Sequence, residues 1–175
     1  NVPITAIYKH ITESDYLINY SSTDFQYIIG NPPWGYEFSE DEKSKLRVLY
    51  KSASGKNIES YDVFIEQALN HLAVSGHLTY VLPKAILNVK AHTEIRKIII
   101  ENCCIKNLDF LGNAFDGVQC PSIILDLQCT HSALSTLGMN VNTNTESFTI
   151  NTERTVNSEY FSFTTSDAEY NVMNK

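Results

Sequence analysis

The sequence predicts an α/β protein with a mostly parallel sheet, helices on both of its faces and an antiparallel hairpin toward its C-terminal end. Three observations support this class. A short, nearly continuous apolar run at 25–29 is typical of a strand buried on both faces of a parallel sheet. A second apolar run at 77–82 also ends at a proline, and amphipathic helical patterns separate the strands. The runs at 105–111 and 121–129 follow one another along the chain, as the two strands of a hairpin would.

Length and composition limit the protein to a few classes. The 175 residues can form one domain with a real core, and a chain that starts at Asn1 rather than methionine suggests an excerpt of a longer protein. An apolar content of 43% and a mean hydropathy of -0.18 are ordinary for a globular protein, and no apolar run approaches the ~20 residues of a membrane span. The net charge of -7 argues against a nucleic-acid-binding surface spread over the whole chain.

The cysteines and histidines do not suggest a metal site. The four cysteines lack Cys-x-x-Cys spacing, and two of them are adjacent, which is awkward for a disulfide or a zinc site. We expect them to be buried reduced thiols of a cytosolic protein. The five histidines are scattered along the chain, so we expect no bound metal. The cysteines are Cys103, Cys104, Cys120 and Cys129.

The apolar run at 25–29 follows a first predicted strand at 4–8 and stops abruptly at Asn31, Pro32 and Pro33. Neither proline can donate a ladder hydrogen bond and both fix φ, so the strand must end there. Beyond it the chain presents an amide, a stiff backbone carbonyl and a large aromatic ring. Ligands of open α/β sheets bind beyond the carboxyl ends of the strands, so this edge is the expected site, although a simple turn is the other interpretation.

The groups beyond this strand suit chemistry at an exocyclic aromatic amine. Such an amine is a poor nucleophile because its lone pair is delocalised into the ring. The Asn31 side-chain oxygen and the Pro32 carbonyl can accept hydrogen bonds from its two N–H groups, which favours a pyramidal nitrogen with a localised lone pair. Trp34 can stack on the ring, at ~1–3 kcal/mol per stacked base. No strong base is needed, because the nitrogen can lose its proton after the transfer.

A helix is predicted directly after this loop. Ser39 and Glu42 belong to a capping-box pattern, and the helix that it starts should run to about Tyr50. Residues 51–59 are predicted to be a flexible loop, which suits either a mobile lid or an ordinary surface loop. Five basic residues fall in this region with no acidic residue between them, so the stretch is either a solvated helix face or a set of phosphate contacts. They are Lys43, Lys45, Arg47, Lys51 and Lys56.

Two further helices are predicted before the hairpin. Ser60 is expected to cap a helix over 61–74, and Gly76 is expected to end it. A third helix is expected over 91–102, beyond Lys84 and the strand that precedes it. The apolar stripe of the earlier helix predicts a core face formed by Val63, Phe64, Ala68, Leu69 and Leu72.

From residue 130 the composition shifts to serine, threonine and asparagine. Residues 130–145 are predicted to form a loop, with short strands near 147–150 and 159–164. We interpret 131–175 as a polar linker or the start of a following region. No internal repeat is visible.

The run Asn31-Pro32-Pro33-Trp34 resembles the Asn/Asp/Ser-Pro-Pro-aromatic motif of amino-methyltransferases that use S-adenosylmethionine. The flanking residues 28–30 and Gly35 resemble the adenine-N6 DNA methyltransferases of type II and IIG restriction–modification systems. The resemblance covers about 10–127 and implies a partial Rossmann-like methyltransferase sheet, with residues 1–130 as the C-terminal part of a catalytic domain. It implies methyl transfer from S-adenosylmethionine to the N6 amine of an adenine that is flipped out of a specific DNA site.

The resemblance also implies roles for single residues. Asp15 and Tyr16 match the segment that contacts the adenine of S-adenosylmethionine, with Asn31 also at the cofactor. Asn31, Pro32, Pro33 and Trp34 would be catalytic. Phe115 matches an aromatic residue that packs against the flipped base opposite Trp34, the alternative being an ordinary core phenylalanine. Phosphate contacts with double-stranded DNA are expected from Lys43, Lys45, Arg47, Lys51 and Lys84.

One departure from the family is serious: the sequence contains no acidic-x-x-x-Gly-x-Gly loop for the cofactor. We expect this loop upstream of Asn1 and a recognition domain downstream of Lys175, with a nuclease fused or separate. The 175 residues alone are therefore expected to be inactive. The resemblance implies a cytoplasmic bacterial or archaeal protein, without membrane contact.

Two other functions stay open. The same motif occurs in enzymes that methylate another planar nitrogen, such as a protein glutamine or an RNA base. A non-catalytic methyltransferase-like subunit that binds DNA or a partner is the third possibility, against which the intact Asn31 argues.

Overall fold

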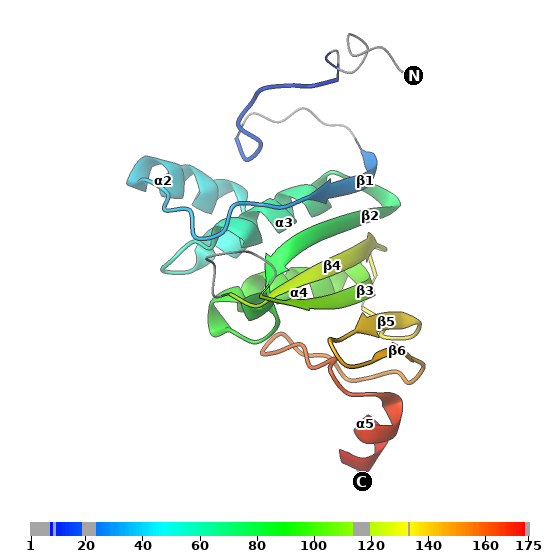
Figure 1. Cartoon of the computed structure of the whole chain (residues 1–175). Helices are drawn as coiled ribbons and strands as arrows, with labels where there is room; N and C mark the ends of the chain where they lie inside the picture. The colour runs from blue at the N-terminus through cyan, green and yellow to red at the C-terminus, as the bar shows by residue number, and fades with distance from the viewer. Residues whose placement is uncertain (1–7, 9, 19–23, 114–119, 133, 174–175) are drawn as a thin grey trace.

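The computed structural model describes residues 8, 10–18, 24–113, 120–132 and 134–173. Its centre is a six-stranded sheet with the strand order β1-β2-β4-β3-β5-β6 (Figure 1). The strands are β1 (Phe25–Gly30), β2 (Leu72–Pro83), β3 (Cys103–Gly112), β4 (Ser122–Cys129), β5 (Met139–Asn142) and β6 (Ser147–Ile150). The helices are α2 (Glu40–Leu49), α3 (Ser60–Asn70), α4 (Thr93–Asn102) and α5 (Asp167–Met173), with short 3₁₀ turns η1 (Lys51–Ser54), η2 (Lys84–Leu87) and η3 (Lys90–His92).

The α/β class and the hairpin are confirmed. Strands β3 and β4 pair antiparallel along their length, as the sequence predicts. Strand β1 is parallel to β2 and β3 is parallel to β5, whereas β2–β4 and β5–β6 are antiparallel. The sheet is therefore mixed, with more antiparallel pairing than expected.

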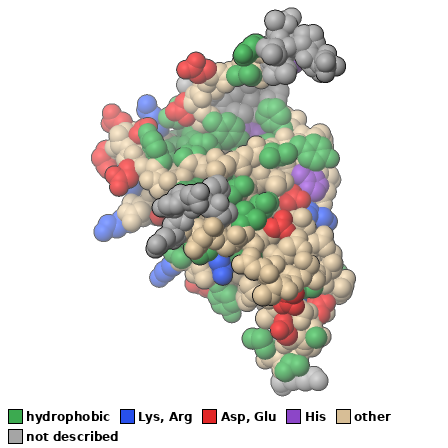
Figure 2. Space-filling model, viewed as in Figure 1, with side chains coloured by type: hydrophobic (Ala, Val, Ile, Leu, Met, Phe, Trp, Pro, Cys, Tyr) green, Lys and Arg blue, Asp and Glu red, His purple; other side chains and the backbone are tan. Residues whose placement is uncertain are grey.

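The expected burial of β1 on both faces is wrong. Strand β1 lies at the edge of the described sheet, where its ladder partner is β2. Tyr27 is 72% exposed and Ile29 is 79% exposed, while Ile28 points to the other face and packs against the core. An apolar run is compatible with a strand that is buried on both faces. Which faces are covered depends on the strands and helices that pack beside it. Figure 2 shows hydrophobic side chains gathered at this end of the molecule.

One face of the sheet carries the main core. Helices α3 and α4 both contribute to it, with Ile65 and Ile99 fully buried, and alternate residues of β2, β3 and β4 face them. The opposite face is half-buried and more polar: His77 and Thr79 of β2 both contact the Asp126 carboxylate. Within the described residues, α3 and α4 share the first face and the second is left without a helical layer, so the prediction of helices on both faces is not met there.

The helix boundaries differ from the prediction at one important place. The capping box at Ser39 and Glu42 is confirmed, and α2 ends at Leu49. However, α3 ends at Asn70 and β2 begins two residues later, so Gly76 lies inside a strand and does not end the helix. A Cβ at Gly76 would lie 2.8 Å from the Phe25 carbonyl oxygen, so the close approach of β1 requires glycine there.

Two segments predicted to be loops carry structure. Residues 51–54 form η1, in which Ser52 and Ala53 are buried. Residues 139–142 form β5, with Met139 and Val141 buried in the main core, so the loop prediction for 130–145 is wrong there. The next strand, β6, is confirmed.

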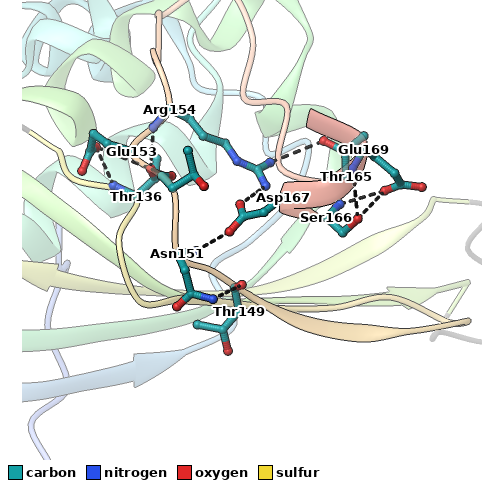
Figure 3. Close-up of polar contacts among 10 residues, drawn as sticks. Thr136, Thr149, Asn151, Glu153, Arg154, Thr165, Ser166, Asp167 and Glu169 are labelled. Atoms are coloured by element: carbon teal, nitrogen blue, oxygen red, sulfur yellow. Dashed lines mark hydrogen bonds and ion pairs between the residues drawn. The ribbon is translucent and has the colours of Figure 1, made fainter. Parts of the chain in front are cut away.

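The C-terminal segment is packed against the same domain. Residues 159–164 are not a strand, but Phe161 lies in the main core. Helix α5 was not expected from the sequence. An ion pair from Arg154 to Asp167 (2.9 Å; Figure 3) joins it to the segment that precedes it. At its start, the Ser166 backbone donates to the Glu169 carboxylate (2.8 Å). Within the described residues, no helix is long and apolar enough to cross a membrane.

Candidate active site

The predicted site lies where β1 and β2 end together. Because the two strands are parallel, their carboxyl ends meet at one edge, and Gly30 of β1 is paired with Tyr80 of β2. A Cβ at Gly30 would lie 3.2 Å from the Tyr80 ring, so glycine allows this close contact. Past it, Asn31 is exposed and Pro32 is buried. The edge therefore presents the Asn31 amide outward from a backbone held by a buried proline ring.

A hollow of about 460 Å³ lies beside this strand end. Its wall is strongly aromatic: the rings of Tyr16 and Phe64 stack with their centroids 5.7 Å apart, and Tyr80 completes the lining on the sheet side. Burial is the main cause that raises the pKa of Tyr80, and the neighbouring Tyr16 raises it further. The Tyr80 hydroxyl therefore stays neutral. Asn31 and Pro32 also line the hollow, so the predicted hydrogen-bond acceptors border a space of aromatic character.

A second, smaller hollow of about 180 Å³ lies on the other side of the same loop. It is lined by Asp15, Pro33 and Phe64, together with Glu42 and Leu46 of α2 and the aromatic side chains of Tyr36 and Phe38 before that helix. One Asp15 carboxylate oxygen accepts a hydrogen bond from the Leu17 backbone N–H (2.9 Å). This hollow combines apolar walls with the carboxylates of Asp15 and Glu42, and a carboxylate can accept a hydrogen bond from the amino group of a planar ring.

Helix α3 holds the loop that carries Asp15. The Gln67 side-chain amide donates to the Tyr16 carbonyl (2.8 Å), and the Tyr50 hydroxyl, just after α2, donates to the Leu17 carbonyl (2.7 Å). Both bonds join residues more than thirty positions apart. The two hollows therefore share a wall whose position is set by long-range contacts.

The structure brings most of the predicted site residues together. Asp15 and Pro33 line the smaller hollow, and Tyr16, Asn31, Pro32 and Pro33 line the larger one. Trp34 is half-buried and packs against the main core, outside the residues that line either hollow. Phe115 lies outside the described residues, so the expected base sandwich stays a prediction.

Phe64 is a site residue that sequence reasoning assigned to the core stripe. It lines both hollows and stacks on Tyr16. The available signal was that Tyr61, Asp62 and Phe64 together resemble the family segment that opens this helix near the active site. Tyr80 carried no such signal, because a tyrosine inside an apolar strand pattern is ordinary core.

The predicted phosphate contacts are dispersed. Lys43 pairs with Glu40 (2.7 Å) and Arg47 donates to the Lys56 carbonyl (3.3 Å), so both side chains have partners on or next to α2. Lys51 lines a different hollow, with Asp24 at the start of β1, and is not brought to Asn31. Lys45 is exposed on α2.

Lys84 follows β2 directly at the edge that carries Asn31. Its ammonium lies 5.3 Å from the centre of the Phe110 ring. Of the five predicted phosphate contacts, Lys84 is therefore placed at the carboxyl edge of the sheet by the strand itself.

Comparison with known proteins decides the family. The model of the Eco57I restriction-modification methylase family matches residues 4–116, more than half of the chain. The chain belongs to this family. The predicted resemblance is thereby confirmed, and the family match includes Asp15, the Asn31–Trp34 loop and α3.

Two curated relatives of the family illustrate its range. The chain is 28% identical over 124 residues to the type II methyltransferase M.VspI of Vibrio sp. (strain 343), covering 70% of this chain and 30% of the relative. It is 32% identical over 102 residues to the type II restriction enzyme and methyltransferase RM.Eco57I of Escherichia coli, covering 55% of this chain and 10% of that protein. The chain thus spans less than a third of the length of either relative.

Solved structures support the fold. A protein of Listeria monocytogenes described as a class I S-adenosylmethionine-dependent methyltransferase matches with a TM-score of 0.56 at 21% identity, covering 70% of this chain and 39% of that one. The type IIG restriction endonuclease BpuSI matches with a TM-score of 0.51 at 12% identity, covering 66% of this chain and 14% of that one. At these identities the likeness concerns the sheet and its helices.

Proposed function

We propose that these residues form the catalytic half of a DNA methyltransferase that transfers a methyl group to the N6 amine of adenine in a restriction–modification system. The observation that carries the proposal is the end of β1, where the exposed Asn31 side chain and the Pro32 backbone border an aromatic-lined hollow. Family membership supports methyl transfer, and the paired acceptors support an amine as the group that is methylated.

The chemistry assigned to this edge is simple. The Asn31 side-chain oxygen and the Pro32 carbonyl accept the two N–H groups of the target amine, so that its lone pair is localised and directed away from the ring. S-adenosylmethionine supplies an electrophilic methyl group. As the bond from the amine nitrogen to the methyl carbon forms, the bond from that carbon to the sulfonium sulfur would break and S-adenosylhomocysteine would leave. The positive charge would pass to the amine, which would then lose a proton to water. The buried Pro32 keeps the backbone acceptor in place during the step.

The described residues fit the adenine part of the cofactor. The smaller hollow offers the Phe64 ring and Pro33 as apolar contacts and the Asp15 carboxylate as an acceptor for an amino group. The glycine-rich loop for the rest of the cofactor is not among the 175 residues, so we propose that it is supplied from outside this chain. Double-stranded DNA would approach the same edge, with Lys84 close to the backbone.

The decisive test is Asn31→Ala in the full-length protein. Removing one of two acceptors should abolish detectable methyl transfer, a loss of at least 10²-fold, as for other preorganised donors and acceptors in active sites. Cofactor binding should be spared, because most of the expected cofactor contacts lie elsewhere. Tritiated methyl incorporation into DNA and calorimetric cofactor affinity measure the two effects. Asn31→Asp is the matched control, since it keeps an acceptor oxygen and should retain part of the activity.

Near-normal turnover by Asn31→Ala would rule out this mechanism. The same assay separates the competing substrates, because DNA, RNA and protein can each be offered as methyl acceptor. Methylation of RNA or protein alone would replace DNA as the substrate. Absence of transfer to all three by the wild-type protein would favour the non-catalytic subunit.

A further inference from the structure

Ser60 is the first residue of α3, yet it does not cap its own helix. The N-cap position is Glu59, whose side chain makes no capping hydrogen bond, so the expected capping role of Ser60 is wrong. The Ser60 hydroxyl instead donates to the Pro33 carbonyl (2.6 Å), 27 residues away. It also accepts from the Tyr36 backbone N–H (3.4 Å). Ser60 is 1% exposed, so one buried hydroxyl bridges the two sides of the turn at Trp34.

The hydrogen bond from Ser60 to the Pro33 carbonyl restricts one backbone angle, the ψ of Pro33. The pyrrolidine ring of Pro33 fixes its φ, so the carbonyl of Pro32 and the carbonyl of Pro33 are related by ψ alone. Binding of the Pro33 carbonyl to Ser60 fixes that ψ. The Trp34 ring follows directly along the chain. Ser60 therefore restricts the direction in which the backbone enters Trp34 relative to the Pro32 acceptor.

The turn of α3 that carries Ser60 is itself anchored. The Tyr61 hydroxyl lies 2.6 Å from His92 Nε2, and His92 Nδ1 lies 2.9 Å from one oxygen of the Asp62 carboxylate and 3.0 Å from the other. With Asp62 ionised and the imidazole neutral, His92 donates from Nδ1 and accepts at Nε2 from the Tyr61 hydroxyl. All three residues are at least nine-tenths buried.

This chain of bonds joins the start of α3 to η3, beyond the end of β2. Burial raises the pKa of Asp62, and the hydrogen bond from His92 opposes that rise. Glu59 and Arg96 are the other charged groups that act on the carboxylate. A buried network in which every member has a partner is rigid, and breaking one bond leaves a buried polar group unpaired.

We propose that Ser60 is a positioning residue for the Asn31–Trp34 loop and that the Tyr61–His92–Asp62 chain holds the helical turn from which it acts. The expected effect of Ser60 on methyl transfer rests on the proposed function. Its role in holding the loop does not, because that role follows from the hydrogen bonds of Ser60 alone.

Trp34 gives a direct readout, because it is the one tryptophan of this chain. Ser60→Ala should free the Pro33 carbonyl and let the indole move. We expect a higher acrylamide quenching constant and a lower steady-state anisotropy of Trp34, with the far-UV circular dichroism unchanged. Ser60→Thr keeps the hydroxyl and should restore the wild-type values. Ser52→Ala is the matched control, since Ser52 is buried against the same helix but its hydroxyl has no hydrogen-bond partner among the residues that the structure describes.

Tyr61→Phe covers the case in which Ser60→Ala does not fold. It removes one hydroxyl from the supporting chain and should raise Trp34 quenching by a smaller amount. Wild-type quenching in a folded Ser60→Ala protein would overturn the proposal, and so would wild-type quenching in Tyr61→Phe if Ser60→Ala is unfolded.

Activity distinguishes this proposal from the proposed function. In the full-length protein, Ser60→Ala should lower kcat by roughly 10- to 100-fold with little change in KM, as expected when a catalytic group is misplaced by about 1 Å. Increased Trp34 mobility with unchanged kcat would show that Ser60 holds the loop but that this contact does not affect methyl transfer. Normal turnover by Asn31→Ala would instead contradict the methylation mechanism, whatever Trp34 reports.

Discussion

Two adjacent residues at the end of β1 have opposite exposures: Asn31 is exposed and Pro32 is buried. The contrast suits a site in which a side chain reaches the ligand and a backbone carbonyl is held rigid. Trp34 is half-buried, with its ring against the main core. At the scale of single residues, the site is therefore an exposed amide beside a buried proline and a half-buried tryptophan.

Trp34 carries a prediction about base flipping. A paired adenine must leave the helical stack at a cost of a few kcal/mol, and stacking on Trp34 should return ~1–3 kcal/mol of it. Trp34→Ala should therefore lower kcat/KM more for a paired adenine than for a mismatched one, whose extrusion costs less. Turnover on matched duplexes that differ at this one pair measures the difference.

Two further measurements strengthen that test. Trp34→Phe keeps an aromatic face and serves as the control, with an intermediate loss. Placing 2-aminopurine at the target reports unstacking as a rise in fluorescence, which stacking in the protein should partly quench. An equal loss on paired and mismatched DNA would show that Trp34 does not stabilise a flipped base.

Among the secondary-structure elements, α3 connects the most parts of the site. Its first residue, Ser60, holds the Asn31–Trp34 loop, and Gln67 holds the carbonyl of Tyr16. Between them, Glu66 accepts hydrogen bonds from the backbone N–H groups of Lys51 (3.0 Å) and Ser52 (2.8 Å) in η1. Three buried polar side chains of one helix thus fix three separate segments, which an apolar stripe alone would not do.

Glu66→Gln tests this function of the helix. An amide offers one acceptor oxygen where the carboxylate offers two, so one buried N–H of η1 loses its partner. Loss of a partner for a buried donor costs about 1–3 kcal/mol, and we expect a decrease of that size in the free energy of unfolding. Urea denaturation followed by circular dichroism measures it.

The same change at Glu101 is the control, because Glu101 is exposed on α4. Glu101→Gln should change stability by less than ~0.5 kcal/mol, as surface substitutions usually do. If the two variants are equally stable, the hydrogen bonds from η1 to Glu66 contribute nothing measurable.

At the scale of the molecule, hydrogen bonds connect the C-terminal segment to the residues that follow β2. Arg96 is fully buried and donates to the carbonyls of Ile86 (2.7 Å) and Val89 (2.9 Å), which follow β2. It also donates to the carbonyls of Ser158 (2.7 Å) and Glu159 (2.8 Å). One side chain therefore joins the segment beyond β2 to residues more than sixty positions further along the chain.

The whole chain also carries a prediction about the cofactor. In the proposed function, Asp15 and the Asn31 loop would provide only one wall of its pocket, and no glycine-rich loop is present in the 175 residues. We expect the isolated chain not to bind S-adenosylmethionine at micromolar affinity, which would correspond to ~-8 kcal/mol. Isothermal titration calorimetry measures this, with the full-length protein as the positive control. Micromolar binding by the isolated chain would place the cofactor elsewhere.

Sequence reasoning was most successful where a few neighbouring residues decide the structure. The end of β1 at Asn31, the capping box at Ser39 and the β3–β4 hairpin are confirmed. It failed at the end of α3, because the apolar spacing of Leu72 fits both a helix and a strand. The phosphate contacts and the role of Phe115 remain predictions.

The sequence by itself determined where β1 ends and the Asn31–Trp34 loop begins, because a proline fixes its own φ and has no N–H to donate to the sheet. Only the tertiary structure decided what surrounds that loop. The exposure of β1 depends on which strands stand beside it, and the partner of the Ser60 hydroxyl lies 27 residues away. Steric rules of the backbone reach a few residues along the chain, whereas burial and hydrogen-bond partners depend on which segments packing brings together.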